Sequence, residues 1–300
     1  MIKTEHLTKS FDGYTAVNDI TCTIPDGCIY GMVGSNGAGK STFLRLITGV
    51  YKADTGSIFY DNEPVYENPS VKARISYVPD DLFFLPGSNI LRMADFYSHI
   101  YPNFDIERCK YLTDAFKLNL KKNIATFSKG MKRQAAIILA LSCKSDYLFF
   151  DETFDGLDPV MRNLVKSLIC QDVIERKATA FVTSHSLREL EDICDQLALL
   201  HNGGLVLEND ITSLKTQQFK LQIAFPFAFD EGLFKDIPHS CFKKLGSVAN
   251  MIVNGDKNVI VSKLESLKPT LLDVLPLTLE EVFTFEMEAL GYNFEDVLEG

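Results

Sequence analysis

Short segments of alternating apolar and polar residues fill the first 80 positions of the chain. Residues 20–24 (ITCTI) and 56–60 (GSIFY) are two such segments. A period of two is typical of β-strands that bury one face and expose the other. We therefore expect a β-rich lobe over residues 1 to about 80.

The apolar spacing becomes helical further along the chain. Leu91, Met93, Ala94, Phe96 and Tyr97 form one such pattern, and a second follows around residues 112–116. Residues 144–207 then alternate strand and helix patterns, which is typical of a parallel sheet covered by helices. We expect a helical subdomain at about residues 82–143 inside an α/β core.

A second, smaller domain is predicted beyond residues 210–214. Residues 220–225 have the pattern of a strand, and the apolar residues 251–253 and 259–261 flank Asn-Gly-Asp-Lys-Asn, which predicts a β-hairpin. Residues 277–283 predict a capped helix. The expected domains are residues 1–215 and a small α/β accessory domain at 216–300, in which the sequence shows no catalytic constellation.

Composition narrows the class of protein. The chain has 300 residues, which favours two domains, and its formal net charge of −10 argues against a nucleic-acid partner. No uncharged apolar run reaches about 18 residues, and the charged N-terminus does not resemble a signal peptide. The cysteines are scattered singly, which predicts small buried residues in a reducing cytosol; they are Cys22, Cys28, Cys109, Cys143, Cys170, Cys194 and Cys241.

Residues 34–41 read GSNGAGKS and fit the phosphate-binding pattern Gly-x-x-x-x-Gly-Lys-[Ser/Thr]. A buried strand is expected at 28–33 and a helix from Thr42, so the positive helix end would face the phosphates. Lys40 supplies charge to the β- and γ-phosphates, and Ser41 offers a hydroxyl to Mg²⁺. A chance glycine-rich turn is the alternative. The predicted nucleotide-binding residues of this segment are Gly34, Ser35, Asn36, Gly37, Ala38, Gly39, Lys40, Ser41 and Thr42.

An apolar strand that ends in acid is the second predicted element of a nucleoside triphosphatase. Residues 147–150 (YLFF) fit a strand buried on both faces, and Asp151 at its end can hold Mg²⁺. Glu152 can then act as general base for the attacking water. The alternative is that these acids only begin a loop or cap a helix.

Ser128-Lys129-Gly130 precede a long helical pattern that runs through Ala140, and Ser128 suits its N-cap. With Phe127 and Met131 they match a signature motif. The chain thereby resembles the ATPase subunit of ATP-binding cassette (ABC) transporters, in the branch that serves drug, peptide and antibiotic exporters. Six motifs occur in the family's order over roughly residues 1–215.

The resemblance assigns further site residues. Phe11 would stack on adenine, with Tyr14 as the alternative ring. Asp158, in Gly-Leu-Asp-Pro, would contact the partner subunit, although it could merely cap a helix. His185 would bind the γ-phosphate and sense its loss, against the alternative of a structural histidine.

Asp80 departs from the family pattern, which has Gln at this position. An amide donates and accepts hydrogen bonds, whereas an ionised carboxylate only accepts. Asp80 can still serve as a ligand of Mg²⁺. Its charge would oppose that of the γ-phosphate. Other members of this branch resemble the chain in carrying an acid here, so we expect function to survive.

The resemblance implies a mechanism in which two cassettes, identical or different, pair head to tail. Each ATP would lie between residues 34–41 of one subunit and Ser128-Lys129-Gly130 of the other. Closure and opening would drive a separate integral membrane permease, which places the chain in the cytoplasm at the inner face of the cell membrane.

The sequence leaves three alternative functions. A soluble ABC ATPase acting on ribosomes or DNA would usually carry two cassettes or a long coiled coil, and a P-loop kinase would leave the signature motif without a role. A nucleotide sensor would not need Glu152.

Overall fold

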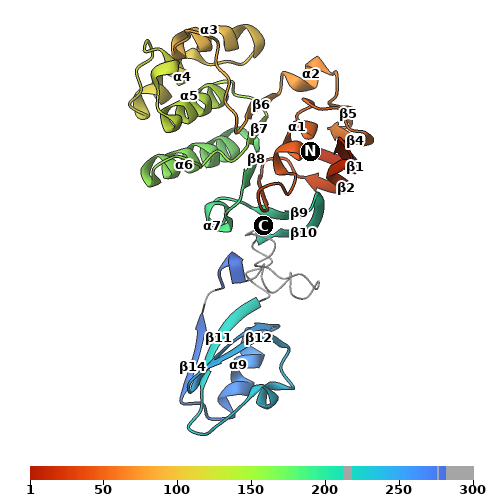
Figure 1. Cartoon of the computed structure of the whole chain (residues 1–300). Helices are drawn as coiled ribbons and strands as arrows, with labels where there is room; N and C mark the ends of the chain where they lie inside the picture. Colours follow the sequence, from red (N-terminus) through yellow and green to blue (C-terminus); the bar gives the residue numbers. More distant parts are fainter. Residues whose placement is uncertain (212–217, 276, 282–300) are drawn as a thin grey trace. The chain divides into compact units, whose positions relative to one another are not determined.

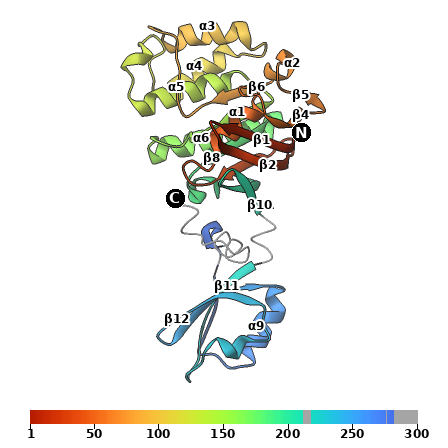
Figure 2. The ribbon, with the colours of Figure 1, turned by 45° about the vertical axis from the view of Figure 1, so that its right-hand side comes forward.

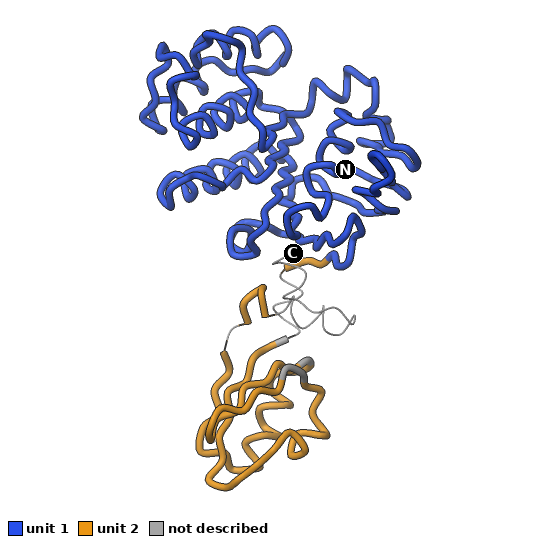
Figure 3. The backbone as a smooth tube through the Cα atoms, in the orientation of Figure 1, with its two compact units in different colours: residues 1–208 blue, residues 209–300 orange. Residues whose placement is uncertain are grey.

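The computed structural model describes residues 1–211, 218–275 and 277–281. The chain divides into two compact units, residues 1–208 and 209–300 (Figure 3). Within the described ranges, no helix combines the length and the hydropathy that a bilayer span requires.

An antiparallel sheet in the order β2-β1-β4-β5 forms the first layer of unit 1. Residues of β2 alternate between buried and exposed over much of its length, because one face of this sheet packs on the core. This confirms the β-rich lobe that the alternating pattern predicts. The strands are β1 (Ile2–Phe11), β2 (Tyr14–Ile24), β4 (Thr55–Tyr60) and β5 (Glu63–Pro64).

The second sheet of unit 1 has six strands in the order β10-β9-β3-β8-β7-β6. The ladders β9-β3, β3-β8, β8-β7 and β7-β6 are parallel. Every residue of β3, β7 and β8 is buried, as expected for central strands covered on both faces. The strands are β3 (Ile29–Val33), β6 (Ile75–Val78), β7 (Tyr147–Phe150), β8 (Thr179–Ser184), β9 (Gln196–His201) and β10 (Gly204–Asp210).

Three helices of unit 1 form one group. The predicted helical subdomain contains α3, α4 and α5, which contact one another, while α5 also contacts β6; Figures 1 and 2 show the three helices together. Helix α6 packs on β8. The bounds are α1 (Lys40–Ile47), α2 (Pro69–Lys72), α3 (Ile90–Ile100), α4 (Ile106–Ala115), η1 (Ile124–Thr126), α5 (Lys129–Ser142), α6 (Pro159–Arg176) and α7 (Leu187–Leu190).

Helix α1 belongs to a core shared by the two sheets. Phe43, Leu44, Leu46 and Ile47 are fully buried and join one hydrophobic cluster with residues of β1, β2, β3 and β8. Apolar burial on this scale fixes the helix firmly. The N-terminus of α1 is thereby held at the carboxyl end of β3, where a parallel sheet binds ligands.

The cysteines of unit 1 are small buried residues with one exception. Cys170 is only half-buried, and Cys241 in unit 2 lies outside the described side chains. The buried ones are Cys22, Cys28, Cys109, Cys143 and Cys194.

Unit 2 contains a four-stranded antiparallel sheet in the order β12-β13-β11-β14. Its own hydrophobic core includes Leu221, Phe234, Val253 and Leu264. The elements are β11 (Gln218–Ala224), η2 (Glu231–Phe234), β12 (His239–Leu245), β13 (Val248–Asn254), α9 (Lys257–Glu265) and β14 (Leu271–Leu275).

The predicted hairpin at residues 251–261 is wrong. Its first strand is β13, but helix α9 follows in place of the second strand. Asp256 accepts hydrogen bonds from the backbone N–H of Asn258 and Val259, so it caps a helix where a hairpin turn was expected. Ile260 and Leu264, four residues apart, then bury one face of α9.

The start of the last predicted helix is present within the described residues. Residues 279–281 are helical, and Thr278 and Glu281 form a reciprocal capping box. The remainder of that prediction, residues 282–283, lies outside the described residues.

Candidate nucleotide-binding site

The phosphate-binding segment connects β3 to α1, as the sequence predicts. Gly39, at the N-cap of α1, has a φ of 106°, and a Cβ there would lie 2.2 Å from the carbonyl oxygen of Ala16. A Cβ on Gly34 would lie 2.4 Å from the carbonyl oxygen of Leu200. Only glycine fits both positions, because the backbone of the loop passes so close to neighbouring strands.

Lys40 points into this loop. Its Nζ donates to the carbonyl oxygens of Gly34 (2.6 Å) and Ser35 (3.0 Å) and forms an ion pair with Glu152 Oε1 at 3.1 Å. The side chain is only 5% exposed. A buried ammonium needs such partners, and the carboxylate is the one that an incoming phosphate could replace.

Asp151 is fully buried at the carboxyl end of β7, next to the phosphate loop. Burial raises its pKa, and the negative charges of Glu152 and Asp80 act in the same direction, whereas hydrogen bonds from Thr183 and Ser41 lower it. Thr183 Oγ1 donates to Asp151 Oδ1 at 2.8 Å. The carboxylate of Asp151 and the nearby hydroxyl of Ser41 supply the hard oxygen ligands that Mg²⁺ prefers.

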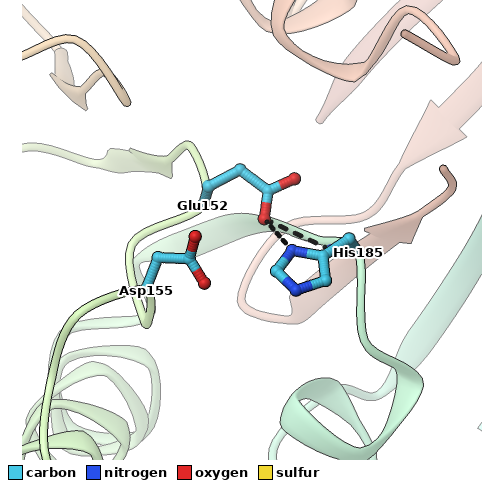
Figure 4. A group of neighbouring side chains, drawn as sticks. All are labelled: Glu152, Asp155 and His185. Carbon is cyan, nitrogen blue, oxygen red and sulfur yellow. Dashed lines mark hydrogen bonds and ion pairs between the residues drawn. The ribbon is translucent and has the colours of Figure 1, made fainter. Parts of the chain in front are cut away.

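Glu152 and His185 face each other at the ends of neighbouring strands (Figure 4). Glu152 Oε2 lies 3.0 Å from His185 Nδ1 and also accepts from the His185 backbone N–H. Glu152 has a φ of 46°, which is unusual for a residue with a side chain and is found at functional sites. Asp155 stands beside them, with the three ligand atoms within 4.8 Å of one another.

A pocket of about 370 Å³ opens over the phosphate loop. It brings together residues from β1, β2, the loop, the end of β6 and the end of β7. Of the predicted site residues, it is lined by Phe11, Asn36, Gly37, Gly39, Lys40, Ser41, Thr42, Asp80 and Glu152.

Both candidate adenine-stacking rings line this pocket. Phe11 is 39% exposed and Tyr14 58% exposed, and Tyr14 donates to the Gly37 carbonyl oxygen at 3.3 Å. Phe11 packs edge-on against Tyr51, with ring centroids 5.5 Å apart. Both rings are therefore partly exposed at the pocket.

The signature residues lie outside this pocket. Ser128 accepts a hydrogen bond from the Met131 N–H and so caps α5, while its side chain and that of Lys129 are exposed. Gly130 lies against Gly156, since a Cβ there would be 2.7 Å from the Gly156 carbonyl oxygen. Asp158 is exposed too and caps α6, accepting from two backbone N–H groups at 3.0 Å.

Asp80 has a partner that the sequence analysis did not find. Arg133, on α5 and 1% exposed, donates through Nη2 to Asp80 Oδ1 at 2.7 Å and through Nη1 to the Pro79 carbonyl oxygen at 3.0 Å. Helical spacing could have indicated that Arg133 is buried, because it precedes the buried Ile137 and Leu141 by one and two turns, but not that it meets Asp80. Asp155 was also missed, since its proximity to His185 depends on the pairing of β7 with β8.

A parallel sheet, a phosphate loop at the N-terminus of α1 and buried acid at the end of β7 define a P-loop nucleoside triphosphatase. The family model for ABC transporters matches residues 17–155. The chain is 31% identical to the ABC transporter ATP-binding protein YtrB of Bacillus subtilis, over 94% of this chain and 97% of that protein. The chain belongs to the ATP-binding proteins of ABC transporters.

A second relative agrees with this, and a solved structure shows the same fold. The bacitracin transport ATP-binding protein BcrA of Bacillus licheniformis is 31% identical over 73% of each chain. The solved dimeric cassette MJ0796, in a post-hydrolysis state with ADP and phosphate, superposes with a TM-score of 0.65 at 19% identity, covering 70% of this chain and 99% of that one. This chain binds ATP and is an ATPase. The relatives do not favour a ribosomal or DNA-directed role.

Proposed function

We propose that the chain hydrolyses Mg-ATP as one half of a cassette dimer that powers a separate membrane-spanning exporter. One observation carries this proposal. The pocket is lined by residues of the phosphate loop, including Lys40, and by Glu152, while Ser128 and Lys129 are exposed outside it. A site built in two halves needs a second subunit to complete it.

The residues around the phosphate loop fit both ATP and Mg²⁺. A Cβ on Gly34 or Gly39 would collide with a neighbouring strand, so glycine at these positions allows the loop conformation whose backbone would surround phosphate oxygens. Ser41 and Asp151 would hold the metal, with Asp80 near enough to influence Asp151 electrostatically. Bound Mg²⁺ would neutralise phosphate charge during hydrolysis.

Glu152 is the proposed general base and His185 the proposed γ-phosphate contact. Glu152 is shared between Lys40 and His185. A γ-phosphate beside Lys40 would compete for that ammonium and free one carboxylate oxygen of Glu152 to accept a proton from water. Phosphate binding would thus make Glu152 available as the base.

The remaining assignments concern the partners. Phe11 would stack on adenine, with Tyr14 as the other candidate, and Ser128, Lys129, Gly130 and Asp158 would face the second cassette. ATP can favour pairing of the two cassettes only to the extent that it binds the closed state more tightly than the open state. Similarity to a bacitracin transport protein supports a role in transport. Export, and a cytoplasmic position at the inner face of the membrane through a permease subunit, are part of the proposal.

Replacing the base tests this proposal. In Glu152→Gln we expect ATP binding to persist, turnover to fall by about 10²- to 10⁴-fold, and an ATP-dependent dimer to accumulate. Size-exclusion light scattering with and without Mg-ATP measures the last effect, alongside phosphate release. Glu175→Gln, a change of the same type at an exposed position of α6, is the matched control.

The outcomes separate the parts of the proposal. Turnover at the parental rate would remove Glu152 as base. Loss of turnover without a dimer would indicate that a different cassette is the partner, which co-purification with the permease would identify.

A further inference from the structure

Among the side chains that the structure describes, Arg133 is the largest that is fully buried, and its surroundings are unusual for a guanidinium. Within the described residues, its Nε has no hydrogen-bond partner. The other two nitrogens both contact the segment directly after β6, at Pro79 and Asp80. A guanidinium stays charged in proteins, so a buried one requires a compensating anion. Asp80 supplies it.

Asp80 in turn belongs to the nucleotide pocket. It lines that pocket together with Lys40 and Glu152. Without Arg133, two carboxylates and a single ammonium would line the pocket, an unfavourable setting for a polyanion. The ion pair with Arg133 offsets the charge of Asp80 and fixes its Oδ1.

We propose that Arg133 is a positioning residue of the nucleotide site, which holds the Asp80 carboxylate and neutralises its charge so that an acid can stand beside a bound γ-phosphate. This inference rests on the proposed function, because it assumes that the γ-phosphate lies near Lys40 and Glu152. It also links helix α5, which Ser128 caps, to the phosphate end of the pocket through one side chain.

The test is a double-mutant cycle on the full chain, made of Arg133→Gln, Asp80→Gln and the double variant. Competition binding measures affinity for ADP and for a non-hydrolysable ATP analogue, so no turnover is needed. In Arg133→Gln the unpaired Asp80 should weaken binding of the ATP analogue by about tenfold and leave ADP affinity unchanged. In the Asp80→Gln background the same change should have no such effect, since there is no charge to neutralise.

Two controls separate positioning from structural support. Arg133→Lys keeps the charge and should restore most of the preference for the ATP analogue. Arg108→Gln breaks another partly buried ion pair, with Asp172, away from the pocket. It should lower the melting temperature and leave the ratio of the two affinities unchanged.

Each result decides one question. Equal losses for ADP and the analogue, or independent effects of the two changes, would overturn the role of Arg133 while leaving the ATPase proposal standing. A parent chain that binds neither nucleotide would overturn the proposed function itself.

Discussion

The contacts of the Lys40 side chain reflect the phosphate-binding function of the site. Its ammonium is buried, and three oxygen atoms surround it at hydrogen-bond distance, two of them main-chain carbonyls of its own loop. The third belongs to Glu152, the proposed base. The lysine is therefore already placed for phosphate, and its contact with Glu152 ties the two functional groups together.

Replacing Lys40 with Ala removes a charged donor to the phosphates. Hydrogen bonds to charged groups contribute about 1.5–3 kcal/mol, so nucleotide affinity should fall about 10- to 100-fold. Isothermal titration with ATP measures the change. Unaltered ATP binding would contradict the assignment of residues 34–41 as the phosphate loop.

At the scale of elements, strand β3 connects the phosphate loop to the rest of unit 1. It pairs with β8 and β9, and its Tyr30 hydroxyl donates to Glu208 of β10 at 2.7 Å. Burial raises the pKa of the Glu208 carboxyl, only partly offset by this hydrogen bond. The Glu208 carboxyl that accepts this hydrogen bond is therefore poorly solvated.

The sign of this shift gives a pH dependence. A raised pKa means that the folded state favours the neutral carboxyl, so the stability that Glu208 contributes is present at acidic pH and is lost as the pH rises through the raised value. Glu208→Gln should then melt at a higher temperature than the parent at pH 8. The difference should shrink as the pH falls toward the usual range for glutamate.

Thermal melting across a pH series measures this effect. Glu175→Gln, at an exposed position, should leave the melting curve unchanged. If the Glu208→Gln variant melts below the parent at pH 8, the Glu208 carboxylate of the parent stabilises β3, contrary to this prediction.

At the scale of the whole molecule, each unit has its own hydrophobic core. All the predicted site residues lie in unit 1, and unit 2 is assigned no catalytic role. Separate cores are the usual sign of domains that can fold alone.

A fragment of residues 1–215 should consequently fold and bind ATP with the affinity of the full chain. Circular dichroism and ATP titration check this. Failure to fold would show that unit 1 depends on residues beyond 215, and a folded fragment with weakened binding would assign unit 2 a part in nucleotide affinity.

The sequence by itself determined the features whose chemistry is local. The phosphate loop, the acid after β7, and the caps at Ser128 and Asp158 depend on residue types at short fixed spacings, so they could be predicted directly. The fold class followed from the change in apolar periodicity along the chain.

Only the tertiary structure decided the rest, because the determining contacts join residues far apart in sequence. Arg133 meets Asp80 across 53 positions, and Glu152 meets His185 across 33. A short segment after β13 could not be assigned from its sequence either. Asn-Gly-Asp suits a turn or a helix cap, and burial of Ile260 and Leu264 in the core of unit 2 selects the helix.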